Sequence, residues 1–335
     1  MNPFTPAQRR SSRLLLCACA LWLAACGGVQ SSLAPAGREA ERIARLFWWM
    51  TGAGVIVWVS VIALAVYLVR LQADPRDRRR NSVLVIGGGV VVPTVVLTVL
   101  LVFGLAMLPP AVARAPAGSL EVHVIGEQWW WRVRYMRQDG SAVDLANELR
   151  LPVGEPVQLR LESDNVIHSF WVPSLAGKMD MIPGRTTYLT LRPTATGIFR
   201  GTCAEYCGTA HALMGFYVEV MEPDAFRRWL DHQAAPAVPV AGPVAGEGQQ
   251  LFLATGCNAC HTVRGTTADG VIGPDLTHAG GRLSVGAGIL RAGPDAFRRW
   301  IATTEQIKPG VHMPAFGMLP DAELRALAAY VEGLK

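Results

Sequence analysis

Two long apolar runs dominate the hydropathy pattern of the first third of the chain. No charged residue occurs from Phe47 to Val69 or from Val83 to Leu108. At 1.5 Å per residue these runs span roughly 35 and 39 Å, enough to cross a hydrocarbon core of about 30 Å with some tilt. We therefore predict a transmembrane helical hairpin over residues 44–110.

The segment between the two runs predicts their orientation. Its sequence RLQADPRDRRRN holds five arginines against two aspartates. The positive-inside rule places such a loop in the cytoplasm. Both ends of the hairpin then face outward, and everything after residue 110 is expected outside the membrane.

The N-terminus has the pattern of an export signal. Three arginines within residues 9–13 precede the apolar stretch LLLCACALWLAAC, which is too short to span a membrane. Its last four residues, Leu23–Cys26, resemble a bacterial lipoprotein box, a family in which the chain is cut before the cysteine and the thiol receives diacylglycerol. An ordinary signal cut elsewhere, or an uncleaved segment, is the alternative. We predict a signal peptide over residues 1–25.

Beyond the hairpin the hydrophobic pattern changes to short strand-like runs. Alternating or β-branched stretches such as LEVHVIG, WWWRVRY, PVQLRLES, TTYLTLRP and GFYVEV occur between residues 119 and 220, separated by Gly and Pro. Several short strands over about a hundred residues indicate a β-sandwich or barrel. The stretch DAFRRWLDHQ then predicts a short closing helix, and we assign the domain to residues 117–232.

The last part of the chain is predicted to be helical. An uncharged Ala-, Pro-, Val- and Gly-rich stretch suits an interdomain linker over residues 233–246. Helical patterns follow over residues 247–335, and the Pro-Asp pairs at 294–295 and 320–321 are good helix starts.

Composition supports a membrane protein and gives little support to nucleic-acid binding. The 335 residues are 51% hydrophobic and 17% charged, with a mean hydropathy of +0.27. The net charge of +5 is mild, and arginines cluster at a few places instead of forming a broad stripe. Of seven cysteines, three lie in the N-terminal 26 residues and four form two close pairs. We expect no structural disulfide.

The stretch CAEYCGTAHALM, residues 203–214, combines soft and borderline metal ligands. Zinc would use the cysteines and histidine, but a methionine would be an odd member. A mononuclear copper site uses one Cys, two His and a Met, and His168 is a second histidine upstream. The additional cysteine favours a pair of copper ions bridged by both sulfurs. The spacing also suits one helix face, but Gly208 and the flanking strand-like runs favour a loop.

The motif C-x-E-x-C-x-x-x-H-x-x-M, with an upstream histidine before VPSL, resembles subunit II of haem–copper oxidases and its dinuclear CuA centre. The resemblance implies a cupredoxin-like β-barrel with the motif in the loop between its last two strands. By this resemblance Cys203 and Cys207 bridge the two coppers, while His168 and His211 each cap one copper. Met214 is a weak ligand to one copper, and the backbone carbonyl of Glu205 is a ligand to the other.

Two further stretches extend the resemblance. GEQWWWRVRY is similar to the aromatic stretch of this family, whose first tryptophan, here Trp129, is associated with electron input. Packing is the alternative role for Trp129, Trp130 and Trp131. KMDMIPGR is similar to K-x-D-x-I-P-G-R, which implies that Lys178 and Asp180 lie near the boundary with another subunit.

The carboxylate of Glu205 matches a family residue that ligates a Mg²⁺ or Mn²⁺ ion shared with subunit I, a hard ion that suits an oxygen ligand. One departure concerns the second apolar run, SVLVIGGGVVVP. Many family members carry an acidic residue and a tryptophan just before its proline, but no carboxylate precedes Pro93 here. The proton-uptake role of that residue is therefore not carried over.

CNACH, residues 257–261, is a C-x-x-C-H motif, the signature of covalent c-type haem attachment. Cys257 and Cys260 would form the thioethers, and His261 would ligate the iron. Zinc or thiol exchange is the alternative for a cytosolic chain. Far downstream, GVHMPAFG supplies Met313 as the sixth ligand, and a thioether ligand raises the reduction potential of haem iron.

Residues 247–335 thereby resemble class I cytochromes c, with CxxCH early, Met-Pro late and a closing helix. Met318 and His312 are competitors for the sixth position, and His278 is read as a loop residue.

Together these parts predict a multidomain membrane protein: a two-helix hairpin, a cupredoxin-like CuA domain and an all-α class I cytochrome c domain. The combination resembles subunit II of caa3-type cytochrome c oxidases in the bacterial inner membrane, with both domains on the periplasmic face. The resemblance implies electron flow from an external donor to haem c, then to CuA, then to haem a of subunit I. Oxygen would be reduced to water at the haem–CuB site of subunit I, in a proton-translocating complex that also contains subunit III.

The resemblance leaves the donor open between a cytochrome c and a quinol-oxidising complex. A CuA-bearing subunit of a nitric oxide reductase or other terminal reductase is the main alternative function. A quinol oxidase subunit would lack the copper ligands, and a simple membrane-anchored cytochrome would leave the copper motif unexplained.

Overall fold

The computed structural model describes residues 28–70, 78–293 and 295–335. Residues 42–113 form one compact unit, and the described residues before 42 together with 114–335 form another. The predicted signal peptide, with Cys17, Cys19 and Cys26, lies outside the described residues.

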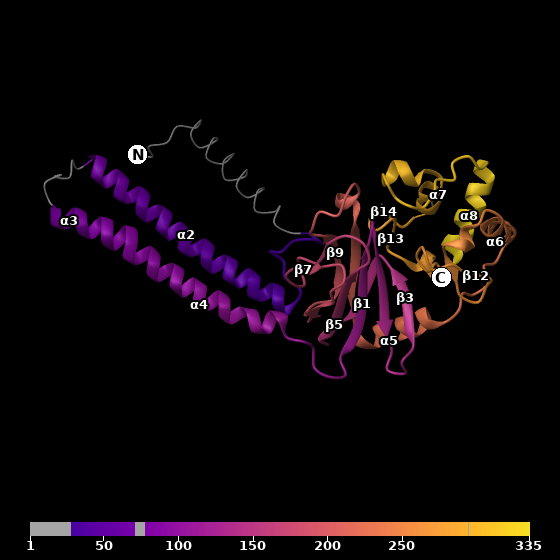
Figure 1. The fold of residues 1–335 in the computed structure, drawn as a ribbon, viewed down its shortest axis with the longest axis horizontal. Helices are drawn as coiled ribbons and strands as arrows, with labels where there is room; N and C mark the ends of the chain where they lie inside the picture. Colours follow the sequence, from indigo (N-terminus) through magenta and orange to yellow (C-terminus); the bar gives the residue numbers. More distant parts are fainter. Residues whose placement is uncertain (1–27, 71–77, 294) are drawn as a thin grey trace, which may run out of the picture. The chain divides into compact units, whose positions relative to one another are not determined.

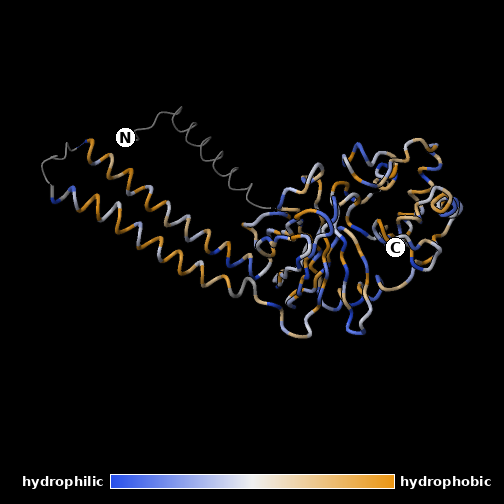
Figure 2. The backbone as a smooth tube through the Cα atoms, in the orientation of Figure 1, coloured by the Kyte–Doolittle hydropathy of each residue, from blue (hydrophilic) through white to orange (hydrophobic). Residues whose placement is uncertain are grey.

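The described part of the unit of residues 42–113 is helical. Its helices are α2 (Arg38–Arg70), which begins in the other unit, α3 (Arg78–Ser82), the π-helical η1 (Val83–Val91) and α4 (Val92–Val112). Two stretches, Arg38–Arg70 and Val83–Leu108, are long and apolar enough to cross a membrane by length and composition. Figure 2 shows apolar residues along most of α2 and α4. The two predicted apolar helices are confirmed as helices.

Two five-stranded sheets make up the domain that follows (Figure 1), in the orders β3-β2-β1-β5-β8 and β4-β10-β9-β6-β7. Strand β1 pairs parallel with β5, and β4 pairs parallel with β10, while the other neighbours are antiparallel. The strands are β1 (Leu120–Glu127), β2 (Trp130–Met136), β3 (Ala142–Ala146), β4 (Glu148–Pro152), β5 (Val157–Ser163), β6 (His168–Trp171), β7 (Met179–Met181), β8 (Thr187–Leu191), β9 (Gly197–Cys203) and β10 (Gly215–Met221), and the helix α5 (Pro223–Ala234) follows.

Alternating apolar residues place the core between the two sheets. In β1, Val122 and Val124 are buried, and in β2 Trp131 and Tyr135 are buried. Tyr135 also ties the sheets together, because its hydroxyl donates to the Arg150 carbonyl at 2.9 Å and accepts the Arg150 N–H at 2.7 Å. The predicted cupredoxin-like β-domain is therefore confirmed, as two facing sheets.

The C-terminal part is mainly helical, as predicted for a cytochrome c domain. It adds two short hairpins to the all-α prediction, because two-residue strands leave no periodicity in a sequence. The elements are α6 (Pro243–Ala254), η3 (Cys257–Ala259), β11 (Thr262–Val263), β12 (Ala268–Asp269), η4 (Ala279–Gly281), β13 (Ser284–Val285), β14 (Leu290–Arg291), α7 (Ala296–Ile307) and α8 (Asp321–Gly333). Helices α6 and α8 pack closely, with Phe252 edge-on to Tyr330 at 5.5 Å between ring centroids.

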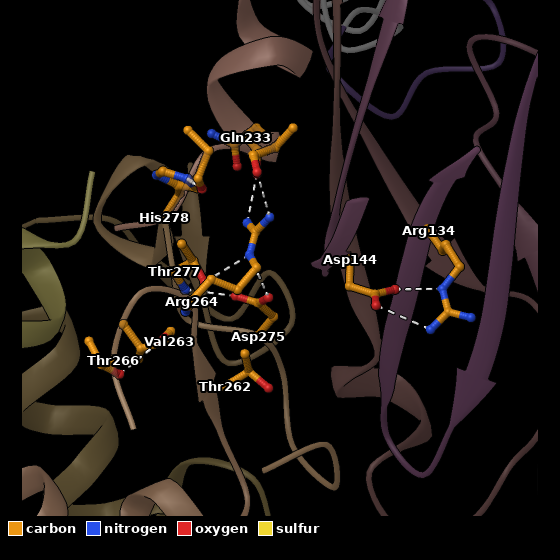
Figure 3. Close-up of polar contacts among 12 residues, drawn as sticks. Arg134, Asp144, Gln233, Thr262, Val263, Arg264, Thr266, Asp275, Thr277 and His278 are labelled. Atoms are coloured by element: carbon orange, nitrogen blue, oxygen red, sulfur yellow. Dashed lines mark hydrogen bonds and ion pairs between the residues drawn. The ribbon is translucent and has the colours of Figure 1, made fainter. Parts of the chain in front are cut away.

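The connection between α5 and α6 spans residues 235–242, a shorter linker than the predicted 233–246. Helix α6 begins early because Pro243 occupies its first position, where a missing N–H loses no hydrogen bond. Arg264 anchors the start of the linker by donating to the Gln233 carbonyl at 2.6 Å and the Ala234 carbonyl at 3.2 Å, and Figure 3 shows its guanidinium directed at Gln233. His278 lies beside the start of the linker, with its Nε2 3.0 Å from the Ala235 carbonyl.

Candidate functional site

The loop between β9 and β10 carries most of the predicted metal ligands. Cys203 is the last residue of β9, and Met214 directly precedes β10. His211 lies in a single 3-10 turn within the loop, so the motif does not form one helix face. His168 begins β6, the strand beside β9, where Phe170 is paired with Cys203. Sheet pairing thus brings a histidine 35 residues upstream to the loop.

Five sulfur and nitrogen side-chain donors converge around the two thiols. The Sγ atoms of Cys203 and Cys207 lie 3.9 Å apart. The Nδ1 of His168 is 3.8 Å from Cys203 Sγ, and the Nδ1 of His211 is 3.6 Å from Cys207 Sγ. The Sδ of Met214 is 3.9 Å from Cys207 Sγ. Each thiol therefore has a different imidazole as its neighbour.

The donor set fits a soft metal in its spacing and its burial. Two metal–sulfur bonds of about 2.3 Å at a near-tetrahedral angle separate the sulfurs by roughly 3.8 Å, close to the observed 3.9 Å. His168, Cys203 and Cys207 are buried, and their ligand atoms lie within 4.8 Å of one another. Soft thiolate and thioether donors with imidazoles favour copper over hard cations.

The two thiols ionise as a pair. The hydrogen bond with Cys207 lowers the pKa of the Cys203 thiol, and the same contact together with burial raises the pKa of the Cys207 thiol. At pH 7 the metal-free pair is therefore expected to hold one proton, shared between the two sulfurs. Metal ligation by both sulfurs would displace that proton, because the thiolate is the ligand.

Copper loading of the full chain at pH 7 should release about one proton from this pair, whereas two ordinary thiols, with pKa values near 8.5, would release nearly two. A pH indicator in weakly buffered solution measures the release, after subtraction of the copper reagent alone. A release close to two protons would show that the thiols ionise independently.

Glu205 points its two oxygen-bearing groups at different neighbours. Its backbone carbonyl accepts the Cys203 thiol at 3.1 Å, and its carboxylate accepts the Tyr206 N–H at 3.3 Å. The Lys178 Nζ lies 2.7 Å from Asp180 Oδ1, and the Glu205 carboxylate adds a further negative charge near this ammonium. The Glu205 carbonyl thus faces the thiols, while its carboxylate acts on Lys178 at the surface.

The three consecutive tryptophans have three different environments. Trp131 is a core residue that packs on Phe170 and Phe216. Trp130 stacks on the Arg132 guanidinium at 4.8 Å. Trp129 is buried, and its Nε1–H donates to the Cys207 carbonyl at 2.9 Å. Only the first of the three is hydrogen-bonded to the thiol loop among the contacts of the described residues.

A cavity of about 290 Å³ lies in the cytochrome-like part and extends to Trp129. A packed core leaves few voids larger than a water molecule, and this volume is near the lower end of ligand pockets, about 300 Å³. The four residues predicted for haem all line it, namely Cys257, Cys260, His261 and Met313. Apolar side chains complete the wall, among them Phe252, Leu276, Phe297, Ile301 and Val331.

His261 is oriented as an iron ligand needs to be. Its Nδ1 lies 2.7 Å from the Pro274 carbonyl, so a proton on Nδ1 leaves Nε2 free to ligate. Burial lowers the pKa of His261, which favours the neutral imidazole that binds metals. Thr304 supports the second proposed ligand by donating its hydroxyl to the Met313 carbonyl at 3.1 Å. The residues present therefore fit a covalently attached haem.

The competing ligands are placed differently. Met318 is 78% exposed and is absent from the cavity lining. His312 lines the cavity but is exposed to solvent. His278 is buried beside the linker, with its ring 4.6 Å from that of His232. Among the alternatives, only His312 shares the cavity with Met313.

The β-domain and the cytochrome-like part meet at the thiol loop. Gly215, next to Met214, donates its N–H to the Ala287 carbonyl at 3.1 Å. Lys308, at the end of α7, donates to the Trp129 carbonyl. Glu148 accepts the Leu283 N–H at 2.7 Å. Sequence reasoning missed these contacts, since no local pattern marks a backbone carbonyl as the partner of a residue far along the chain.

This fold and site define a class of electron-transfer protein: a cupredoxin-like domain with a sulfur-rich metal site, joined to a cytochrome c-like domain and preceded by apolar helices. The sequence matches the family described as "Cytochrome C oxidase subunit II, periplasmic domain" over residues 137–221. It matches the family "Cytochrome c" over residues 245–335.

Relatives in two bacteria extend these matches over most of the chain. Cytochrome c oxidase subunit 2 of Alkalihalophilus pseudofirmus is 32% identical over 295 residues, which cover 84% of this chain and 84% of the relative. The protein of the same name from Bacillus subtilis is 30% identical over 350 residues, covering 96% and 97%. The chain belongs to the cytochrome c oxidase subunit 2 family and is a subunit of a haem–copper oxidase complex.

Among solved structures, the periplasmic domain of cytochrome oxidase subunit II of Bradyrhizobium japonicum is 29% identical, with a TM-score of 0.33. The match covers 37% of this chain and 96% of the solved chain. The predicted family and its fused cytochrome c domain are thus confirmed by the family matches and the two relatives.

Proposed function

We propose that this chain is the electron-input subunit of an O2-reducing haem–copper oxidase of the caa3 type. Electrons from an external donor would be received by the cytochrome domain, cross to the copper domain and leave toward subunit I. One observation carries this proposal: the Trp129 indole lines the cavity around the C-x-x-C-H motif and donates to the Cys207 carbonyl at 2.9 Å. A single side chain thus touches both candidate cofactor sites.

The residues at each site have separate proposed tasks. Six residues would hold a dinuclear copper centre: His168, Cys203, Glu205, Cys207, His211 and Met214. Four would hold haem c: Cys257, Cys260, His261 and Met313. When bound, the two groups supply one-electron chemistry with little change of bond length at the copper pair. The ligands, of which His168, Cys203, Cys207 and Met214 are buried, would keep their positions in both redox states.

The packing around Trp129 supports delivery of electrons through the chain's own cytochrome domain. Trp129 is only 7% exposed. A Cβ atom at Gly310 would lie 3.1 Å from the indole ring, so the cytochrome domain covers this face of the tryptophan closely. A soluble donor therefore has no direct access to Trp129 and would deliver electrons to the haem side.

Several finer assignments complete the proposal. The chain would be anchored by two helices in a bacterial inner membrane, with domains 117–232 and 247–335 on the periplasmic face. Subunit I, with haem a and CuB, would be the acceptor, and subunit III a further neighbour. A cytochrome c or a quinol-oxidising complex would be the donor. Glu205 would share a Mg²⁺ or Mn²⁺ ion with subunit I, and Cys26 would be lipidated. Both relatives are named cytochrome c oxidase, which favours oxygen over nitric oxide as the substrate of the complex.

The test is an electron paramagnetic resonance spectrum of the oxidised full-length subunit, loaded with copper and haem. Hyperfine coupling to two equivalent copper nuclei is expected, together with one covalently attached haem per chain. Coupling to a single nucleus, or an unchanged spectrum on copper addition, would overturn the copper assignment and with it the proposed relay.

A further inference from the structure

Lysine is rare in this chain, and one lysine is buried against the copper domain. Of 31 basic residues only Lys178, Lys308 and Lys335 are lysines. Lys178 is paired with an aspartate at the surface, and Lys335 is the exposed last residue. Lys308 is 2% exposed. It follows α7 and begins the turn that leads to Met313.

The Lys308 amine crosses from the cytochrome domain to the copper domain. Its Nζ donates to the backbone carbonyl of Trp129, 179 positions away in the sequence. Either protonation state of the amine has an N–H to donate. Two residues later, the Gly310 backbone packs on the Trp129 ring, since a Cβ there would lie 3.1 Å from two ring carbons. One short segment therefore holds both the backbone and the ring of Trp129.

The copper loop holds the other side of the same indole. Trp129 Nε1 donates to the Cys207 carbonyl at 2.9 Å, and a Cβ at Gly208 would lie 3.1 Å from the ring. Gly208 has φ of +111° and Gly310 has φ of +80°, so both glycines combine left-handed backbone with close approach to the ring. The indole is thus enclosed between one segment of each domain.

Packing alone does not account for a lysine at this position. Burial of an amine removes its hydration, and an unbranched apolar side chain would fill the same volume without that loss. The burial lowers the pKa of Lys308 to about 7. What the lysine adds over an apolar residue is the hydrogen bond to the Trp129 carbonyl.

We propose that Lys308 is a positioning residue for electron transfer between the two domains, because it fixes the Trp129 backbone and so holds the indole between Cys207 and the cytochrome cavity. This inference rests on the proposed function. It adds a residue that binds no cofactor but determines the relative position of the groups that do.

Three variants of the full chain in the purified oxidase test the role. K308M removes the N–H donor but keeps an unbranched side chain, K308R restores a donor, and K335M makes the same change at the exposed last residue. The measurement is the optical rate at which an electron placed on haem c by a light pulse reaches the copper centre. A misplacement of about 1 Å lowers the rate of a positioned reaction by as much as about a hundredfold. We expect K308M to be slower by roughly tenfold to a hundredfold, K308R to recover most of the rate, and K335M to match the wild type.

A second readout does not depend on the transfer rate. In hydrogen–deuterium exchange of the full chain in the purified oxidase, peptides covering residues 128–134 and 306–313 should exchange faster in K308M than in the wild type. K335M should leave both peptides unchanged. This difference reports the Lys308–Trp129 contact itself.

Three outcomes would overturn the inference: a wild-type transfer rate in K308M, loss of the haem or copper spectrum along with the rate, or no recovery in K308R. The first outcome would show that Lys308 does not affect the transfer rate. The second would show that Lys308 only supports the folded structure, and the third that the hydrogen bond is not the cause of the lower rate. Failure of the proposed function would be visible separately, as a wild-type chain without coupling to two copper nuclei.

Discussion

Replacement of Cys207 by serine is expected to abolish coupling to two copper nuclei and to lower electron delivery to subunit I by more than about a hundredfold. Mutation of residues that only support metal ligands lowers activity by up to about a hundredfold, and loss of a ligand should cost more. Cys207 is the centre of the donor set, with Cys203, His211 and Met214 each within 3.9 Å of its sulfur. Serine supplies a hard hydroxyl that neither bridges soft metals nor ionises near neutral pH.

Electron paramagnetic resonance of C207S in the full-length subunit measures the coupling, and oxygen uptake by the complex measures the delivery. The matched control is C260S, which alters a cysteine of the cytochrome cavity and should leave the two-nucleus coupling intact. Retention of that coupling in C207S would contradict the proposed role of Cys207 as a ligand of both coppers.

Replacement of Trp129 by leucine is expected to slow electron transfer from haem c to the copper centre by roughly a hundredfold, while both cofactor spectra stay unchanged. Leucine lacks the N–H that meets the Cys207 carbonyl at 2.9 Å and leaves a gap between Gly208 and Gly310. None of the six proposed copper ligands or four proposed haem ligands is altered, so the change acts on the connection between the sites.

The neighbouring substitution W130L is the matched control for W129L. Trp130 lines the same cavity but stacks on Arg132 instead of the thiol loop. We expect W130L to retain most of the transfer rate. Equal rates in W129L and W130L would show that the indole of Trp129 has no special place in the transfer.

W129L and K308M separate two parts of the same connection. W129L removes the indole, whereas K308M keeps the indole but removes the hydrogen bond that fixes the Trp129 backbone. W129L should therefore lower the transfer rate more than K308M does. An N–H donor at position 308, as in K308R, should restore the rate only when the indole of Trp129 is present.

The elements that the sequence predicted well are those with a long local pattern. The apolar helices, the alternating strands β1, β2 and β5, and the helix α8 after its Pro-Asp start are all in place. Strands β4, β6 and β7 have three to five residues and were not predicted. A run of that length is too short to show a period of two, and β6 owes its pairing to β9 and β7.

The candidate ligands could be selected from spacing, because Cys203, Cys207, His211 and Met214 lie within twelve residues and the C-x-x-C-H motif within five. Metal chemistry restricts residue type so strongly that such short motifs are informative. His168 was a candidate as an upstream histidine, but spacing alone could not select it, since its contact with Cys203 depends on the pairing of β6 with β9.

By itself, then, the sequence determined the class of each part: apolar helices by their length, a β-rich domain by alternation, and two candidate cofactor sites by ligand spacing. Only the tertiary structure decided that Trp129, among three tryptophans, meets the thiol loop, that Lys308 reaches the Trp129 carbonyl, and that Ala287 accepts from Gly215. The physical reason is that ligand motifs and periodicity are local properties of the chain. The contacts that join the two sites are made by buried side chains and backbone carbonyls far apart in sequence, and these meet only when the domains pack.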